Sequence, residues 1–262
     1  MTISGRASEL KSWNTPFRNN LRITAQPASC PVPAKVVGQV AATLSKRAQK
    51  MNRTHLPGIF AMATIVVASN ILVQFLILDG LLTWGAFTYP LAFLVTDIMN
   101  RVYGVGPARK VVLAGFVTGI LCSLIGSQII LEFGPAVPLR IAIASGTAFL
   151  IAQLTDIAVF DRFRAGRWWQ APLVSTLVGS ALDTALFFTI AFSASLTVFG
   201  PNADAAINWA WEAVPFLNSG PLAPLWVTLA CADWLVKLAL ALLALIPFRL
   251  IVRRLTPARH PT

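Results

Sequence analysis

The chain has 262 residues, of which 56% are hydrophobic and only 12% are charged, and its formal net charge is +11. A soluble domain carries about 25% charged residues, so this composition excludes an ordinary water-soluble fold. The basic residues stand singly or in pairs beside apolar segments, which favours attraction to anionic membrane lipid over nucleic-acid binding.

The first 55 residues are polar and basic, with nine Lys and Arg residues and a single acid, Glu9. No apolar run follows the first charges closely enough for a cleavable signal peptide. We therefore expect a disordered cytoplasmic tail over residues 1–55. Met51 stands just before the first apolar run, and a translation start at Met51 is an open alternative.

Six apolar runs follow the tail, and a membrane-spanning helix needs about 20 such residues. Their approximate bounds are 58–78, 84–99, 111–131, 141–160, 173–199 and 224–251. The pattern predicts an all-α, polytopic membrane protein with six transmembrane helices within residues 56–255. Residues 256–262 are expected to form a short second tail.

Lys and Arg residues alternate between the two sides of the predicted helices. The first tail has nine, the loops after the second and fourth runs have three each, and the C-terminus has four, which makes 19 of 21. The opposite side has only Arg140, and Lys237 lies inside the sixth run. Because basic residues beside a span resist translocation, both termini are predicted to be cytoplasmic.

Polar residues inside the runs are the candidate functional residues, since an ionisable group at mid-span costs at least about 2.5–3.5 kcal/mol. We expect the following set to line a ligand cavity: Asn70, Gln74, Asp97, Gln153, Asp156, Ser180, Asp183, Thr184, Phe187, Asp233 and Lys237. Asp97 and Asp156 lie near basic cytoplasmic loops, so structural pairing with Arg101 and Arg162 is equally open.

Asp183 and Asp233 lie deeper, roughly 16 Å from a span end. Asp233 and Lys237 are four residues apart and therefore share a helix face. Such a pair either neutralises itself or forms a gate that a ligand opens. Carboxylates and amides in an apolar pocket suit a flat, purine-like small molecule, because one carboxylate can accept two adjacent N–H groups.

The loop over residues 200–221 contains Pro and Trp but no basic residue. It is expected to form either a partial lid on the outer side or an ordinary interfacial loop.

From residue 58 to about 255 the chain resembles the queuosine precursor transporter family, membrane proteins that take up 7-cyano-7-deazaguanine and its aminomethyl relative. The matching residues are Ser69-Asn70, Gln74, Thr83-Trp84-Gly85-Ala86-Phe87, Pro90, Thr96-Asp97, Arg101, Gly104, Ala108-Arg109, Arg140-Ile141-Ala142, Gln153, Asp156, Trp168-Trp169, Ala171-Pro172, Ser175-Thr176, Asp183-Thr184, Phe187-Phe188, Ile190-Ala191-Phe192, Asp233 and Lys237. The resemblance implies a multi-pass importer of a bacterial inner membrane that supplies tRNA modification.

Two alternatives to a stand-alone importer remain open. The chain's size also suits the substrate-binding component of an ATPase-driven vitamin-type uptake system, although the first run lacks an Ala-x-x-x-Ala docking face. An intramembrane aspartyl protease would use paired carboxylates, but the chain has no Gly-x-Gly-Asp sequence. We expect no enzymatic activity, no metal and no cofactor, and a homodimer is compatible with the sequence.

Overall fold

The computed structural model describes residues 55–78, 80–131 and 134–256, so the expected tails lie almost entirely outside the described residues. Five helices in this part are long and apolar enough to cross a membrane. They are His55–Leu72, α4 (Val105–Gln128), α5 (Leu139–Phe163), α6 (Gln170–Phe192) and α8 (Leu225–Leu255). Together with the shorter α3 (Leu91–Tyr103) they confirm the predicted all-α class.

The second predicted span, residues 84–99, is not one long helix. It consists of the single turn α2 (Gly85–Thr88), a break at Tyr89-Pro90, and α3. Pro90 has no N–H to donate, so one hydrogen bond of the helix ladder is missing here, although Tyr89 and Pro90 keep helical dihedral angles. Gly85 lets α2 lie against the preceding segment, because a Cβ there would stand 3.0 Å from the Val73 backbone.

The first predicted span also ends early, at Leu72 rather than at residue 78. The remaining residues form turns and the short hairpin β1 (Leu76–Ile77) and β2 (Leu82–Thr83). The apolar run therefore continues past the helix because the hairpin is apolar too. The third predicted span is longer than expected at its start, because α4 begins at Val105, six residues before the predicted residue 111.

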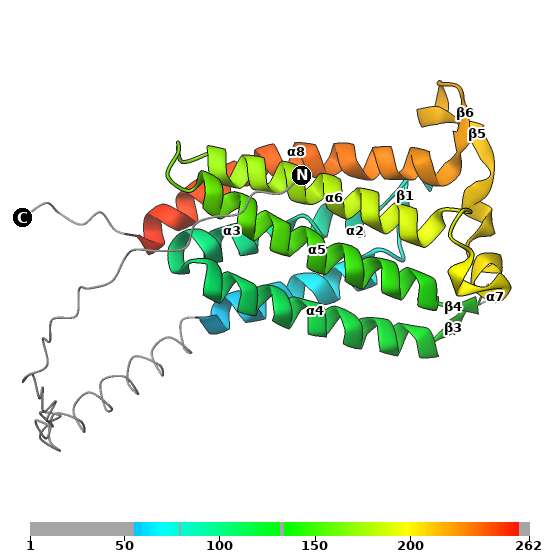
Figure 1. The fold of residues 1–262 in the computed structure, drawn as a ribbon, viewed down its shortest axis with the longest axis horizontal. Coiled ribbons are helices and arrows are strands. Elements are labelled where there is room, and N and C mark those ends of the chain that lie inside the picture. Colours follow the sequence, from blue (N-terminus) through cyan, green and yellow to red (C-terminus); the bar gives the residue numbers. More distant parts are fainter. Residues whose placement is uncertain (1–54, 79, 132–133, 257–262) are drawn as a thin grey trace, which may run out of the picture. The chain divides into compact units, whose positions relative to one another are not determined.

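Short elements gather in the connections. A second hairpin, β3 (Ile130–Leu131) and β4 (Gly134–Pro135), joins α4 to α5. The loop between α6 and α8 contains η1 (Thr197–Phe199), α7 (Pro201–Ala205), η2 (Asn208–Trp211), η3 (Phe216–Asn218) and the hairpin β5 (Ala213–Pro215) and β6 (Leu222–Pro224). Figure 1 shows these pieces at the same end of the bundle as the β3–β4 hairpin.

α5 and α6 form the centre of the helix bundle. In their most apolar windows 44% and 39% of the residues are buried, against 17% in α4 and α8. Helix α5 packs against α4 on one side and α6 on the other, and α6 packs against α8 (Figure 1).

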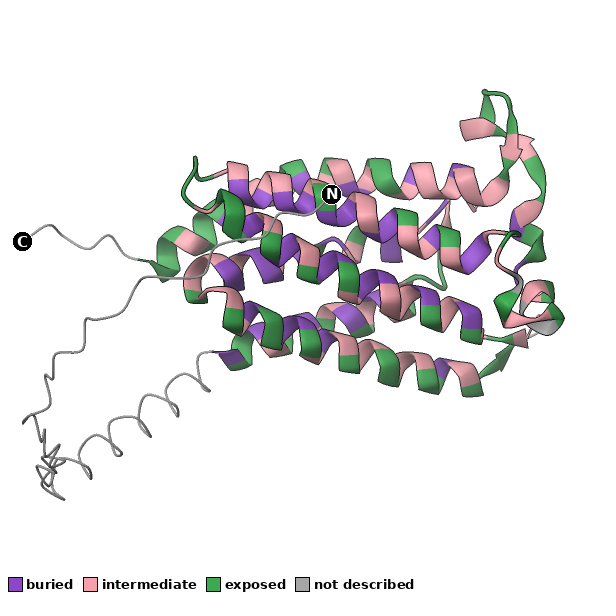
Figure 2. Ribbon diagram, viewed as in Figure 1, coloured by how far each residue is buried: buried purple, intermediate pink, exposed green. Residues whose placement is uncertain are grey.

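The burial pattern is that of a protein in lipid. Large apolar side chains such as Leu124 on α4 and Leu243 on α8 are about 60% exposed, whereas Asp156 and Gln153 are fully buried. Figure 2 shows the buried residues on the helix faces that meet other helices and the exposed ones on the outward faces. An apolar exterior around polar interior groups fits a hydrocarbon solvent, where polar atoms must find partners inside the protein.

Candidate functional site

The deepest polar network joins α6 to α8 through Lys237. Its ammonium donates to Asp183 Oδ2 at 2.7 Å and contacts Asp233 Oδ2 at 2.5 Å. The residue is only 5% exposed. The predicted pairing of Asp233 with Lys237 is therefore confirmed, and Asp183 from the neighbouring helix completes it.

Thr184 ties the same three charges together. Its hydroxyl donates to Asp233 Oδ2 at 2.9 Å and accepts from Lys237 Nζ at 3.0 Å. Asp183 and Thr184 follow each other on α6, so both side chains reach α8 from one turn of helix. We call Asp183, Thr184, Asp233 and Lys237 the central network.

Tyr89 extends the central network to the break in the second span. Its hydroxyl donates to Asp183 Oδ1 at 3.0 Å, and its ring centroid lies 5.5 Å from the Lys237 ammonium. The distance is within the usual range for a cation–π contact. Tyr89 immediately precedes Pro90, so the junction of α2 and α3 places an aromatic ring beside the charges.

The central network carries a net charge of −1, from two carboxylates and one ammonium. Asp183 is thirteen residues from the first residue of α6 and nine from the last, which places it roughly 20 Å and 14 Å from the helix ends. It therefore lies near the middle of the bundle. Phe187 is one turn further along α6 than Asp183 and packs edge-on against Phe188, with the ring centroids 5.1 Å apart.

A second buried cluster lies between α3, α5 and α6. Asp97 is 2% exposed and accepts hydrogen bonds from Ser175 at 3.1 Å and Thr176 at 3.2 Å. Asp156 is fully buried within hydrogen-bond reach of the Asp97 carboxyl. We call Asp97 and Asp156 the carboxyl pair.

Amide side chains surround the carboxyl pair on the α3–α5 interface. Gln153 accepts from the Thr96 hydroxyl at 2.6 Å, and its own amide nitrogen has no hydrogen-bond partner among the described residues. Asn100 donates to the Ile157 carbonyl at 3.1 Å and accepts from the Arg164 guanidinium. The polar part of this interface runs from Thr96 to Asn100 on α3, a little more than one helical turn.

The alternative pairing of the carboxyls with loop arginines is not observed. Arg101 donates instead to the carbonyl oxygen of Arg164 at 2.7 Å. In the described ranges the only ion pairs are Arg140–Asp204, Arg164–Asp161 and the two of Lys237. The carboxyl pair therefore has no neutralising cation within the structure.

Three other predicted site residues belong to neither cluster: Ser180 lies between the two clusters, and Asn70 and Gln74 lie apart from both. Ser180 is fully buried on α6 between the clusters and donates to the Leu177 carbonyl of its own helix. Asn70 donates within its own helix to Val66 at 2.9 Å. Gln74 lies beyond the end of that helix, is exposed, and reaches the Ala136 carbonyl at 3.4 Å. In this conformation the amides of Asn70 and Gln74 make no hydrogen bond to either cluster.

At the end of the bundle that carries the α6–α8 loop, Arg140 is fully buried. Its guanidinium donates to the Ile190 carbonyl at 2.9 Å, the Ser193 carbonyl at 2.6 Å and Asp204 at 2.6 Å. It thereby binds the C-terminal turn of α6, whose last carbonyls have no partner within the helix, and holds α7 against it. The indole N–H of Trp211 adds a bond to the Phe192 carbonyl at 2.7 Å.

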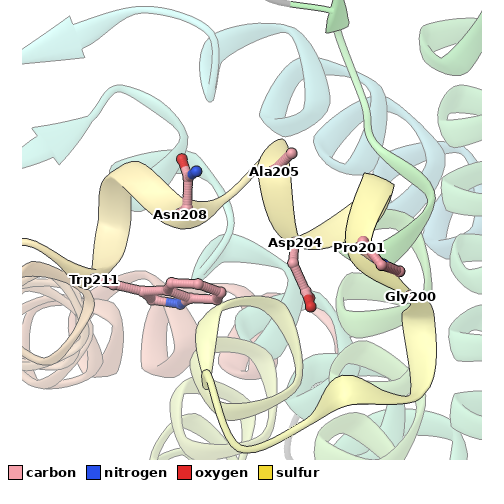
Figure 3. A pocket seen from close by; sticks show the side chains of 6 residues that line it. All are labelled: Gly200, Pro201, Asp204, Ala205, Asn208 and Trp211. Atoms are coloured by element: carbon pink, nitrogen blue, oxygen red, sulfur yellow. The ribbon is translucent and has the colours of Figure 1, made fainter.

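The same loop surrounds a surface cavity of about 460 Å³. Figure 3 shows its lining residues, which all come from the loop itself: Gly200, Pro201, Asp204, Ala205, Asn208 and Trp211. The loop is thus folded and held to α6. This fits a partial lid and an interfacial loop equally well, so both predictions stay open.

Sequence reasoning did not select Tyr89 or Arg140 as site residues. Tyr89 is one of only two tyrosines in the chain and directly precedes the proline of the second run, which is a usable signal. Arg140 is the one basic residue on the predicted outer side and also one of the residues that match the resembled family. An isolated arginine on the side that otherwise lacks basic residues is a signal for a buried role.

Comparison with known proteins identifies relatives over the membrane part. A family model described as "Putative vitamin uptake transporter" matches residues 83–252. The "Queuosine precursor transporter" of Escherichia coli (strain K12) is 38% identical over 158 residues, which cover 55% of this chain and 69% of the relative. No solved structure matches.

Two further relatives show the same similarity. The "Probable queuosine precursor transporter" of Haemophilus influenzae is 33% identical over 177 residues, covering 63% of this chain and 66% of the relative. That of Bacillus subtilis is 27% identical over 195 residues, covering 67% and 73%. The matched range of the family model includes both buried clusters and more than half of the chain. The chain is a multi-pass membrane protein that belongs to the "Putative vitamin uptake transporter" family, a family of transporters rather than enzymes.

Proposed function

We propose that this protein imports queuosine precursors, the 7-deazaguanines, across a bacterial inner membrane. The printed names of its relatives support this substrate class. The observation that carries the proposal is the central network, because two carboxylates and one ammonium in mid-bundle are expensive in hydrocarbon and are typical of a substrate pathway.

The chemistry of the central network suits a 7-deazaguanine. The ring of such a compound presents a lactam N–H and an exocyclic amino group side by side, and one carboxylate accepts both. The Lys237 ammonium bridges the Asp183 and Asp233 carboxylates. We infer that substrate displaces the ammonium from one carboxylate, while Tyr89 and Phe187 offer flat faces to the ring.

The break between α2 and α3 supports the same location. Transporters commonly form substrate sites near the membrane midplane from interrupted helices, whose freed backbone groups line the cavity. Tyr89 stands at this break and bonds to Asp183. Asp97, Gln153 and Asp156 lie in the cluster of the carboxyl pair, apart from the central network, and are not proposed to contact the substrate.

Both termini are proposed to be cytoplasmic, with the irregular stretch at residues 84–103 crossing the membrane as the second of six spans. The bias of 19 basic residues to one side supports this orientation. Single cysteines placed at Ser219 and Thr256 in a cysteine-free background give a direct test. An impermeant maleimide applied to intact spheroplasts should label the first position and not the second, and labelling of both or of the second alone contradicts the topology.

The proposed function is tested by uptake in a strain that cannot synthesise the precursor. The wild-type protein should restore queuosine in tRNA at low external 7-cyano-7-deazaguanine. Asp183→Asn should require about 10- to 150-fold more precursor, since a hydrogen bond to a charged group contributes about 1.5–3 kcal/mol. Asp161→Asn, on the exposed end of α5, is the matched control.

Each result bears on a separate part of the proposal. Failure of the wild-type protein to restore queuosine contradicts the substrate. Full restoration by Asp183→Asn at the wild-type precursor concentration contradicts the assignment of the central network.

A further inference from the structure

The carboxyl pair is unusual because Asp156 receives no hydrogen bond. Neither of its carboxyl oxygens has a donor among the described residues, although the residue is fully buried. The Ser175 hydroxyl lies beside both carboxyls but donates to Asp97. The Asp97 carboxyl lies next to that of Asp156. Two carboxylates can form a hydrogen bond with each other only when one of them carries a proton.

No other charge in the surrounding helices compensates the carboxyl pair. On α3 the next charged residue, Arg101, donates to a backbone carbonyl, and on α6 the only charged residue is Asp183. On α5 Asp161 is paired with Arg164 at the exposed end of the helix, and on α8 Lys237 is held by the central network. Arg109 and Lys110 of α4 are exposed. Like charges in a dry site disfavour double ionisation, as in paired catalytic carboxyls that share one proton.

A small cavity lies beside Asp97 of the carboxyl pair. It has a volume of about 10 Å³, its polar lining residues are Asp97 and Thr176, and the rest of its lining is apolar and includes Leu240, Ala241 and Ala244 of α8. This is close to the space that one water molecule needs. Ala241 is one turn beyond Lys237, so the cavity lies next to the central network along α8.

We infer that the carboxyl pair is a proton-binding site that couples precursor uptake to the proton gradient. Thr176 and Asp183 are seven residues apart on α6, so the pair lies roughly 10 Å along the helix from the central network. With one proton the pair has a charge of −1. Release of that proton to cytoplasmic water leaves both carboxylates ionised, with a charge of −2, and requires the cavity to open. This inference rests on the proposed function for its substrate.

The bound proton is tested without any substrate. Infrared spectra of the purified full-length protein in detergent near neutral pH should contain the carbonyl band of a protonated carboxylic acid. That band should shift or disappear in Asp156→Asn and in Asp97→Asn, because each removes one member of the hydrogen-bonded pair, and it should remain unchanged in the control Asp161→Asn. A wild-type spectrum without the band overturns the inference, whatever the protein transports.

Coupling is tested with purified protein in liposomes, with the membrane potential clamped to zero. A pH difference of one unit, acidic on the side of the α6–α8 loop, should drive about tenfold accumulation of labelled 7-cyano-7-deazaguanine if one proton moves per substrate. Asp156→Asn should lose this accumulation, while substrate exchange without a gradient falls far less. Asp161→Asn should accumulate like the wild type.

The outcomes separate the two proposals. Accumulation by Asp156→Asn equal to that of the wild type, or accumulation that follows a sodium gradient and ignores pH, overturns the coupling role. Absence of both exchange and accumulation in the wild type, with the infrared band present, contradicts the proposed substrate and leaves the proton-binding pair standing.

Discussion

Removing the ammonium at the centre of the bundle by Lys237→Met should destabilise the protein strongly. The substitution preserves the volume of the aliphatic stem but leaves Asp183 and Asp233 buried without a cation. Loss of one partner from a buried ion pair costs about 3–5 kcal/mol. For a chain of this size that corresponds to a decrease of roughly 6–20 °C in Tm, at about 2–4 °C per kcal/mol.

A second substitution distinguishes charge balance from simple loss of packing. Asp183→Asn alone leaves one carboxylate opposite the ammonium, and its cost is expected to be about 1.5–3 kcal/mol. In the double variant Lys237→Met/Asp183→Asn the net charge of the central network returns to −1. The double variant should therefore be more stable than the sum of the two single effects predicts, by at least about 1 kcal/mol.

Thermal unfolding of the purified proteins in one detergent measures all of these differences. Asp161→Asn, which removes an exposed ion pair, should change stability by no more than about 1 kcal/mol. Strict additivity of the two substitutions, or a Lys237→Met protein as stable as the wild type, would refute the reasoning that Lys237 neutralises both carboxylates.

Three other substitutions probe separate contacts. Tyr89→Phe keeps the ring over the ammonium and removes one hydrogen bond, so it should cost about 1 kcal/mol in stability and raise the KM of uptake several-fold; an unchanged KM would remove the tyrosine from the site. Gly179→Ala places a Cβ 2.8 Å from a Phe93 ring carbon and should cost about 1–3 kcal/mol. Gly146→Ala places a Cβ 3.5 Å from a Phe116 ring carbon, an ordinary contact, and should be nearly neutral in the same thermal assay. Arg140→Ala frees two carbonyls and Asp204, and should expose the 200–221 loop to protease at least several times faster than in the wild type; equal cleavage rates would show that the loop is held by other contacts.

The apolar runs and the basic-residue bias are local properties, and they were sufficient to predict the membrane class and five of the long helices. The second span was predicted too regular. Hydropathy averages over a window, so it does not register that Pro90 removes one backbone donor and divides the segment into α2 and α3. The first span was predicted too long because an apolar hairpin follows the helix without a change in hydropathy.

The site residues divide in the same way. Asp233 and Lys237 could be paired from the sequence alone, because a four-residue spacing on a helix brings two side chains together. The contacts of this pair with Asp183 and Tyr89 could not be predicted from the sequence. Lys237 and Asp183 are 54 positions apart, and Tyr89 and Asp183 are 94 positions apart. The same holds for Asp97 and Asp156, which face each other only because α3 packs against α5.

By itself the sequence determined which side chains had to be kept away from lipid, since the cost of placing a charge in hydrocarbon depends only on the charge and its depth. The tertiary structure alone decided how those side chains are satisfied. It divides seven of the eleven candidates between a cation-bridged network and a carboxyl cluster without a cation, with Ser180 and Phe187 placed beside or between them. That partition arises from the packing of α3, α5, α6 and α8, which brings together residues that no local spacing relates.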